Sequence, residues 1–187
     1  MGISEEQILN AKKFAYEKHK NQKRKDGITS YTDHLEGVVH RLKNIGITDT
    51  GVICAAWLHD VLEKTDVTFE EIIQRFGRKV ANLVLSLSKD SNLSGKNAEN
   101  QYIKQLRDAP IEAKIIKLCD ISSNIKSISN SPLSNTQKNK QIRKMLHYLR
   151  VIKKEISEEK SQYPKIQDIM DGIDTIAIKF KQRSISV

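Results

Sequence analysis

Residues that break helices are rare in this sequence, and their scarcity constrains the fold more than any other feature. The 187 residues include only three prolines and eight glycines. In the long stretches between them, apolar residues recur at three- and four-residue spacing, for example at Ile8, Ala11 and Phe14. That period belongs to one face of an α-helix, whereas half-buried strands alternate at every second residue. The pattern predicts an all-α bundle of about eight to ten helices.

Length and composition favour a single folded domain. A chain of 187 residues can enclose one hydrophobic core and is short for two. Hydrophobic residues make up 38% and charged residues 29%, which excludes a disordered chain. We find no internal repeat. The domain is expected to cover residues 1–180, followed by a C-terminal tail at residues 181–187.

Neither a membrane span nor a signal peptide is expected. No run approaches eighteen consecutive apolar residues, and the N-terminal segment MGISEEQILN is acidic and polar. The two cysteines, Cys54 and Cys119, lie in the apolar segments ICAAW and IKLCD. Such thiols are most simply reduced and buried, as in cytoplasmic proteins. We therefore predict a cytoplasmic protein with no membrane partner.

The excess of positive charge points to an anionic ligand. Lysine and arginine number 32 against 23 acidic residues, which gives a net charge of +9. Such a charge could bind nucleic acid, an anionic membrane or a phosphorylated small molecule. The densest cluster is KHKNQKRKDG at residues 18–27, although a solvated helix end would explain it too. Aromatic residues make up only 5% and no nucleic-acid motif is present, so no nucleic-acid partner is expected.

Several polar residues interrupt helices that are otherwise apolar. His34 falls on the apolar stripe of a helix expected near residues 31–45, His59 and Asp60 follow ICAAWL, and Asp120 lies within IIKLCDISSNI. A buried carboxylate is costly unless it is paired. His34 alone could be a hydrogen-bonded core histidine. Taken together, the four residues are most simply explained as ligands of one divalent cation.

The mixed set of nitrogen and oxygen donors also indicates which metal ions the site would bind and which reaction they would assist. Two imidazoles with two carboxylates suit Mn²⁺, Fe²⁺ or Zn²⁺ better than Ca²⁺. Such an ion polarises a phosphoryl oxygen and lowers the pKa of a bound water. In a single helix over residues 51–64, Glu63 lies four residues after His59 and could orient or deprotonate that water. Lys64 lies four residues after Asp60 and borders the same patch. The segment DSNLSGKNAEN, residues 90–100, is expected to be a loop over the site.

Three segments also resemble a known family. His34, the pair at residues 59–60 and Asp120 resemble the H…HD…D signature of the HD-domain superfamily of metal-dependent phosphohydrolases. QKRKDGITSYTDHLEGVV, AAWLHDVLEKTDVTFEEIIQRFGRKVANLV and APIEAKIIKLCDISSNIKSI are similar to segments of the (p)ppGpp hydrolases. That group includes the Rel/SpoT hydrolase domain, the metazoan SpoT homologue and the small alarmone hydrolases. The resemblance covers most of residues 5–155 and implies an HD-domain helical bundle with a central metal site.

The resemblance implies a role for individual residues. His34, His59, Asp60 and Asp120 match the metal ligands, usually of Mn²⁺, and Glu63 matches an acid that handles the nucleophilic water. The residues matching the nucleotide-binding positions are Arg24, Lys25, Lys96, Asn124 and Ser127. Arg24 and Lys25 match basic residues beside the nucleotide, Asn124 one that contacts the nucleoside, and Lys96 a lysine that faces phosphate. The implied reaction removes the 3′-diphosphate from ppGpp or pppGpp and gives GDP or GTP and pyrophosphate.

Lys64 departs from the family pattern, because the family has a second acid at this position. A lysine cannot position water as an acid does, but it could contact a phosphate, change the preferred substrate or reduce activity. The leading hypothesis is therefore a (p)ppGpp pyrophosphohydrolase. One alternative is a phosphohydrolase for another nucleotide, such as an adenine alarmone, NADPH or a nucleoside monophosphate. Another is a weakened enzyme that acts as a nucleotide-binding sensor. The oligomeric state is not predicted.

Overall fold

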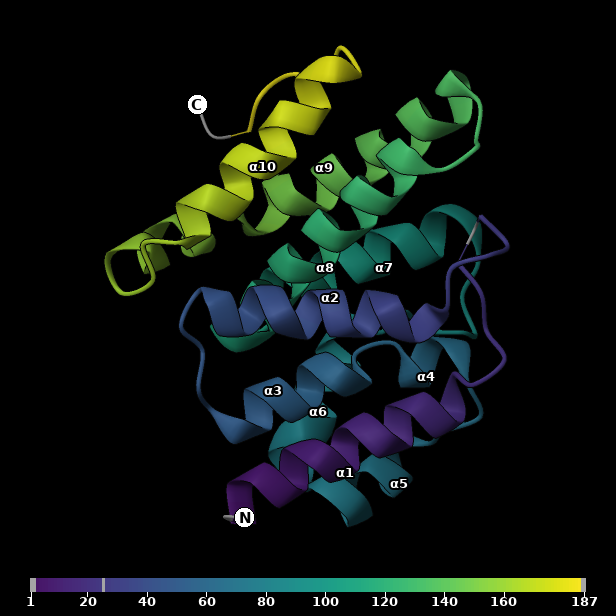
Figure 1. Ribbon diagram of the computed structural model, residues 1–187, viewed down its shortest axis with the longest axis vertical. Helices are drawn as coiled ribbons and strands as arrows, with labels where there is room; N and C mark the ends of the chain where they lie inside the picture. The colour runs from purple at the N-terminus through teal and green to yellow at the C-terminus, as the bar shows by residue number, and fades with distance from the viewer. Residues whose placement is uncertain (1–2, 25, 186–187) are drawn as a thin grey trace.

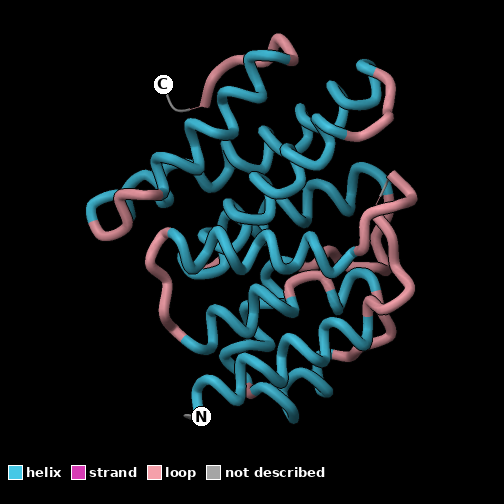
Figure 2. Tube along the Cα trace, in the orientation of Figure 1, coloured by secondary structure: helices cyan, strands magenta, loops and turns pink. Residues whose placement is uncertain are grey.

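The structure is a computed structural model that describes residues 3–24 and 26–185. Within these residues it has ten α-helices, one short 3₁₀-helix and no strand beyond an isolated bridge between Lys23 and Ser30 (Figure 2). The predicted all-α fold of eight to ten helices is confirmed. The helices are α1 (Ile3–Lys18), α2 (Tyr31–Asn44), α3 (Thr50–Leu58), α4 (Val61–Lys64), α5 (Phe69–Phe76), α6 (Arg78–Leu87), α7 (Gly95–Asp108), α8 (Ile111–Asn130), α9 (Asn135–Glu158), η1 (Glu159–Ser161) and α10 (Ile166–Lys179).

Two helices form the centre of the bundle. Every residue of α3 from Val52 to Leu58 is buried, and α3 packs against α1, α2 and α6. Most of α8 is also buried, and it packs against α2, α9 and α10. Figure 1 shows α1, α3 and α5 towards one end of the long axis and α9 and α10 towards the other, with α2 and α8 between them. The fold therefore has two halves that meet along α2 and α8.

One segment boundary differs from the sequence-based expectation, and one domain boundary stays a prediction. The loop expected at residues 90–100 is shorter, since α7 begins at Gly95 and buries Tyr102 and Leu106 on one face. Beyond α10, the backbone N–H of Ile185 donates to the carboxylate of Asp174 at 2.7 Å. The described part of the expected tail thus packs on α10, and the domain boundary at residue 180 stays a prediction. No described helix is both long and apolar enough to cross a membrane.

Asp49 caps α3, and its removal should weaken the fold in a pH-dependent way. Asp49 accepts hydrogen bonds from the Val52 N–H at 2.9 Å and from Lys79 Nζ at 2.8 Å. The Lys79 ammonium, together with the cap bond, lowers the pKa of Asp49 below its usual 3.8. Because the folded state favours the carboxylate, this stabilisation is present above about pH 4 and is lost as the pH falls further.

We expect Asp49→Ala to lower the free energy of unfolding by about 1 kcal/mol at pH 7, and by less at pH 3. Urea unfolding at both pH values measures the difference. Asp49→Asn keeps a capping oxygen but loses the ion pair, so its effect should be smaller. An equal loss at both pH values would contradict a role for the carboxylate charge.

Candidate active site

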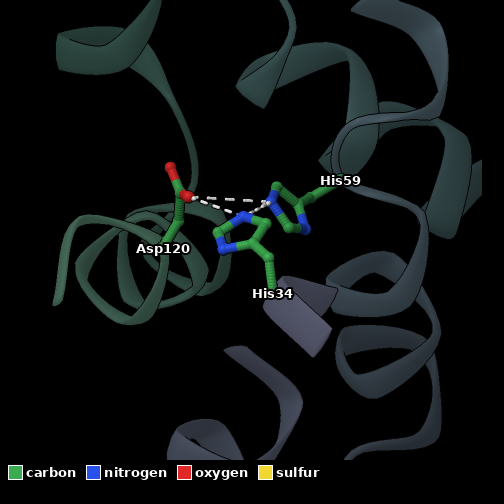
Figure 3. Close-up of side chains that lie close together, drawn as sticks. All are labelled: His34, His59 and Asp120. Atoms are coloured by element: carbon green, nitrogen blue, oxygen red, sulfur yellow. Dashed lines mark hydrogen bonds and ion pairs between the residues drawn. The ribbon is translucent and has the colours of Figure 1, made fainter. Parts of the chain in front are cut away.

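Four side chains converge where the two halves of the fold meet. His34 comes from α2, His59 and Asp60 directly follow α3, and Asp120 comes from α8. His34 Nε2 lies 3.3 Å from His59 Nε2 and 3.2 Å from Asp120 Oδ1. Asp60 Oδ2 lies 3.3 Å from His59 Nε2 and 3.6 Å from His34 Nε2. Figure 3 shows His34, His59 and Asp120 pointing towards one another.

Contacts on the far side of each ring orient both imidazoles. His59 Nδ1 donates to the carbonyl oxygen of Ala56 at 2.8 Å, and His34 Nδ1 lies 3.1 Å from the hydroxyl of Ser123. Since a carbonyl oxygen only accepts, His59 carries a proton on Nδ1, and in the neutral ring its Nε2 lone pair faces the cluster. Both histidines thus present Nε2 to the two carboxylates, as metal-binding histidines do.

The charges of this cluster favour a cation at its centre. Burial opposes ionisation of Asp60 and Asp120, but His59 beside Asp60 and Lys117 beside Asp120 outweigh it and hold the pKa of both carboxyls below 3.8. Burial also opposes the charge on His59, but Asp60 and Asp120 raise its pKa to about 10. An imidazolium therefore supplies positive charge between the carboxylates. A divalent cation could replace that charge, and His34, His59 and Asp120 present ligand atoms within 4.8 Å of one another.

His59 and Asp60 lie in a break between α3 and α4, where one continuous helix was expected. That expectation is wrong, because Asp60 has φ −107° and ψ −3° and the regular helix ends at Leu58. Neither glycine nor proline marks the break in the sequence. Tyr31 donates its hydroxyl hydrogen to Asp60, and the Gln22 amide donates to the Lys64 carbonyl at 2.8 Å. The first bond holds Asp60 within the break, and the second holds the end of α4. The two neighbouring side chains of the break thus reach one cluster, although a regular helix would separate them by about 100°.

A cleft of about 630 Å³ opens over the cluster. The residues selected from the sequence that line it are Arg24, His59, Asp60, Glu63, Lys64, Asp120, Asn124 and Ser127. Lys96 lies instead in the first turn of α7 and is not among the lining residues. Lys25 falls outside the described residues. The proposed roles of Lys96 and Lys25 therefore stay predictions.

Arg24 and Asn124 extend the cluster into the cleft. Arg24 Nη2 donates to Asn124 Oδ1 at 2.7 Å, and Asn124 Nδ2 donates to Asp120 Oδ1 at 2.5 Å. The Arg24 guanidinium also lies 5.5 Å from the centre of the Tyr31 ring. A hydrogen-bonded chain thus joins the basic segment after α1 to the carboxylate on α8. It places a planar cation at the edge of the cleft, where it can stack on a flat ring.

Glu63 and Lys64 form the wall beside this cluster. Glu63 Oε2 accepts a hydrogen bond from the backbone N–H of Lys89 at 3.2 Å. Lys64 Nζ lies 3.6 Å from Glu63 Oε1 and 3.7 Å from Asp60 Oδ1. Burial opposes the charge of Lys64, but the carboxylates of Asp60, Glu63 and Asp120 outweigh it and raise its pKa. The ammonium therefore stays charged and lies against both acids rather than pointing into solvent.

Sequence reasoning missed further residues that line the cleft, among them Tyr31, Lys89, Lys117, Lys144 and Tyr148. Lys117 lies three residues before Asp120 on α8 and donates to its Oδ2 at 2.8 Å, so helical spacing could have revealed it. Lys89 Nζ donates to the Tyr148 hydroxyl at 2.9 Å across 59 residues of chain. No local pattern in the sequence signals a contact of that kind.

Comparison with known proteins assigns the class. A family model for the HD domain matches residues 11–149, and the chain belongs to that family. Among its relatives is guanosine-3′,5′-bis(diphosphate) 3′-pyrophosphohydrolase MESH1 of Danio rerio, which is 40% identical over 124 residues, or 65% of this chain and 69% of the relative. MESH1 of Homo sapiens is 37% identical over 131 residues, or 69% of this chain and 73% of the relative.

A solved structure supports the same grouping. It belongs to a metazoan orthologue of SpoT that is described as hydrolysing ppGpp and acting in starvation responses. It superposes with a TM-score of 0.76 at 25% identity, and the match covers 92% of this chain and 94% of the other. The resemblance to HD-domain (p)ppGpp hydrolases that the three sequence segments carry is thus confirmed.

Proposed function

We propose that this protein is a metal-dependent pyrophosphohydrolase acting on ppGpp and pppGpp. The observation that carries the proposal is the convergence of two imidazole nitrogens and two carboxylates at the floor of a cleft lined with cations. The curated relatives carry the name of this activity. In the reaction, water adds to the phosphorus next to the 3′ oxygen and the bond between them breaks. GDP or GTP and pyrophosphate are the products.

His34, His59, Asp60 and Asp120 are the proposed ligands of a divalent cation, with Mn²⁺ as the proposed ion. When bound, the ion supplies a Lewis acid for a phosphoryl oxygen and lowers the pKa of a nearby water. The donor set of two nitrogens and two carboxylate oxygens supports a borderline metal. Tyr31 and Lys117, which donate to Asp60 and Asp120, fix the directions of the two carboxylates.

The other residues of the cleft bind the substrate and move a proton. Glu63, held by the Lys89 N–H, would orient the attacking water and accept its proton. Arg24 would stack on the base, and Asn124 and Ser127 would contact the nucleoside. Lys64 adds a permanent cation near the reacting phosphate, where it attracts the anionic substrate. The partner is thus a small nucleotide, and the free buried cysteines Cys54 and Cys119 support a cytoplasmic location.

The direct test is release of pyrophosphate from ppGpp by the purified protein. We expect release in the presence of Mn²⁺ and none after chelation, with recovery when Mn²⁺ is restored. Parallel assays with NADPH and an adenine alarmone test the choice of substrate. Turnover of one of these without release from ppGpp would replace the guanosine substrate in the proposal. Absence of any metal-dependent turnover or binding would contradict it altogether.

A further inference from the structure

One long stretch of the chain is basic and contains no acidic residue. Residues 121–154 contain eight lysines and arginines and no aspartate or glutamate, and the whole chain has a net charge of +9. Most of these cations lie on α9, the long helix near one end of the molecule (Figure 1). Of the eight, only Lys144 lines the cleft. The proposed hydrolysis therefore does not account for the charge of this helix.

The basic residues of α9 form a straight line on its outer face. Lys140, Arg143, His147, Arg150 and Lys154, here called the basic ridge, are all exposed and follow one another at three- and four-residue spacing. At 1.5 Å per residue the ridge is about 21 Å long. The opposite face of α9 is buried in the bundle through Ile142, Leu146, Leu149, Ile152 and Ile156. The ridge thus points away from the core over about four helical turns.

The cations of the ridge repel one another, and among the residues described only Lys154, at its end, has a carboxylate, that of Glu155, acting on its charge. Lys140, Arg143, Arg150 and Lys154 form no ion pair within 4 Å in the described part of the chain, whereas Lys144 pairs with Glu99 at 3.1 Å. Like charges at these spacings destabilise a helix by about 0.2–0.5 kcal/mol per pair. Solvated helix faces usually intersperse acids among their basic residues. The ridge is instead a line of one sign, which an anionic partner would stabilise.

We propose that the basic ridge binds the phosphodiester backbone of nucleic acid, a function separate from the proposed hydrolysis. A linear polyanion with regularly spaced phosphates matches a straight row of cations. A membrane fits less well, because the apolar face of α9 is buried and cannot insert into lipid. A protein partner fits less well too, since the exposed large hydrophobic residues, Ile28, Leu85, Leu93 and Ile178, all lie off this helix. The proposal departs from the sequence-based expectation of no nucleic-acid partner. That expectation rested on few aromatic residues and no recognition motif, which argue against stacking on bases and reading of base edges, and backbone binding needs neither.

Fluorescence anisotropy with the full-length protein tests the proposal. The probes are a short single-stranded RNA, the same sequence as a DNA duplex, and phosphatidylserine vesicles. We expect the wild type to bind nucleic acid with a dissociation constant of about 1–100 µM. Four neutralised phosphates should make log K fall with log salt concentration at a slope of about −3 to −4. Comparison of the two nucleic acids shows which of them the ridge prefers.

A matched pair of variants separates the ridge from net charge. The ridge variant combines Lys140→Glu, Arg143→Glu, Arg150→Glu and Lys154→Glu. The control variant combines four changes at exposed, scattered positions, Lys20→Glu, Lys43→Glu, Arg78→Glu and Lys165→Glu, and has the same net charge. We expect at least about tenfold weaker binding and a shallower salt slope for the ridge variant alone. Equal weakening in both variants, or binding of wild type to vesicles but not to nucleic acid, would overturn the proposal.

Discussion

A His59→Ala variant should lose metal-dependent hydrolysis and metal-dependent stabilisation together. His59 Nε2 lies within 3.3 Å of both His34 Nε2 and Asp60 Oδ2, so its removal takes one donor from the centre of the proposed site. We expect pyrophosphate release to fall by more than about a hundredfold, since loss of a residue that only supports a ligand already costs about 10–100-fold. Wild type in Mn²⁺ at a hundred times the dissociation constant should gain about 2.7 kcal/mol of stability. The variant should gain none.

Glu63→Gln provides the matched control for this variant. Its side chain keeps the shape of the acid and has no place among the proposed ligands, so stabilisation by Mn²⁺ should persist. Hydrolysis should still fall by about 10²–10⁴-fold, because the amide cannot accept the proton of the water. Thermal unfolding with and without Mn²⁺, alongside pyrophosphate release, measures both effects. If His59→Ala kept the full Mn²⁺ stabilisation, the assignment of His59 as a ligand would be wrong.

A Lys64→Asp variant should turn over faster and bind ppGpp more weakly. The Lys64 ammonium lies 3.6 Å from the Glu63 carboxylate and 3.7 Å from that of Asp60. A cation this close pairs with the Glu63 carboxylate and competes with water for it, and an acid in its place would remove that competition. We expect kcat to rise by about tenfold. KM for ppGpp should rise as well, because a cation that attracts phosphate has gone. Steady-state kinetics at a fixed Mn²⁺ concentration measures both constants.

Lys64→Met separates loss of the cation from gain of the acid. It should raise KM as the aspartate does while changing kcat less. A fall in kcat in both variants would mean that the ammonium itself stabilises the transition state. A wild type that binds ppGpp without turnover, with activity appearing in Lys64→Asp, would support a nucleotide sensor rather than an enzyme. The kinetics of these two variants therefore decide what the lysine does.

Local sequence patterns were enough to select residues that converge in the fold. His34, Asp60 and Asp120 each stood out because a polar group on an apolar helix needs a partner, and that argument does not depend on the tertiary structure. They converge because a buried polar side chain finds its partner in another buried polar side chain. The roles of these residues as metal ligands stay predictions that the His59→Ala experiment addresses.

Features that depend on tertiary contacts could not be predicted from the sequence. The break between α3 and α4 contains no glycine or proline. Its Asp60 is held by a bond from Tyr31, and the end of α4 by one from Gln22, and both partners lie far away in the chain. Lys89 reaches the cleft because the loop after α6 passes beside α9, where it meets Tyr148. Lys96 looked equally suitable by composition, yet α7 begins at Gly95 and places Lys96 away from the lining of the cleft. Helical period predicts which face is apolar, but not where a loop carries its side chains.

The position of the His34 cluster at the junction of the two halves has a consequence for the stability of the whole domain. His34 contacts Ser123 across 89 residues of chain, and Asp120 belongs to the same turn of α8. A cation held there would close a very long loop, as a cross-link does, and would connect α2 and α3 to α8. An occupied site would therefore raise the free energy of unfolding of the whole domain. Loss of the ion would lower that stability together with the activity.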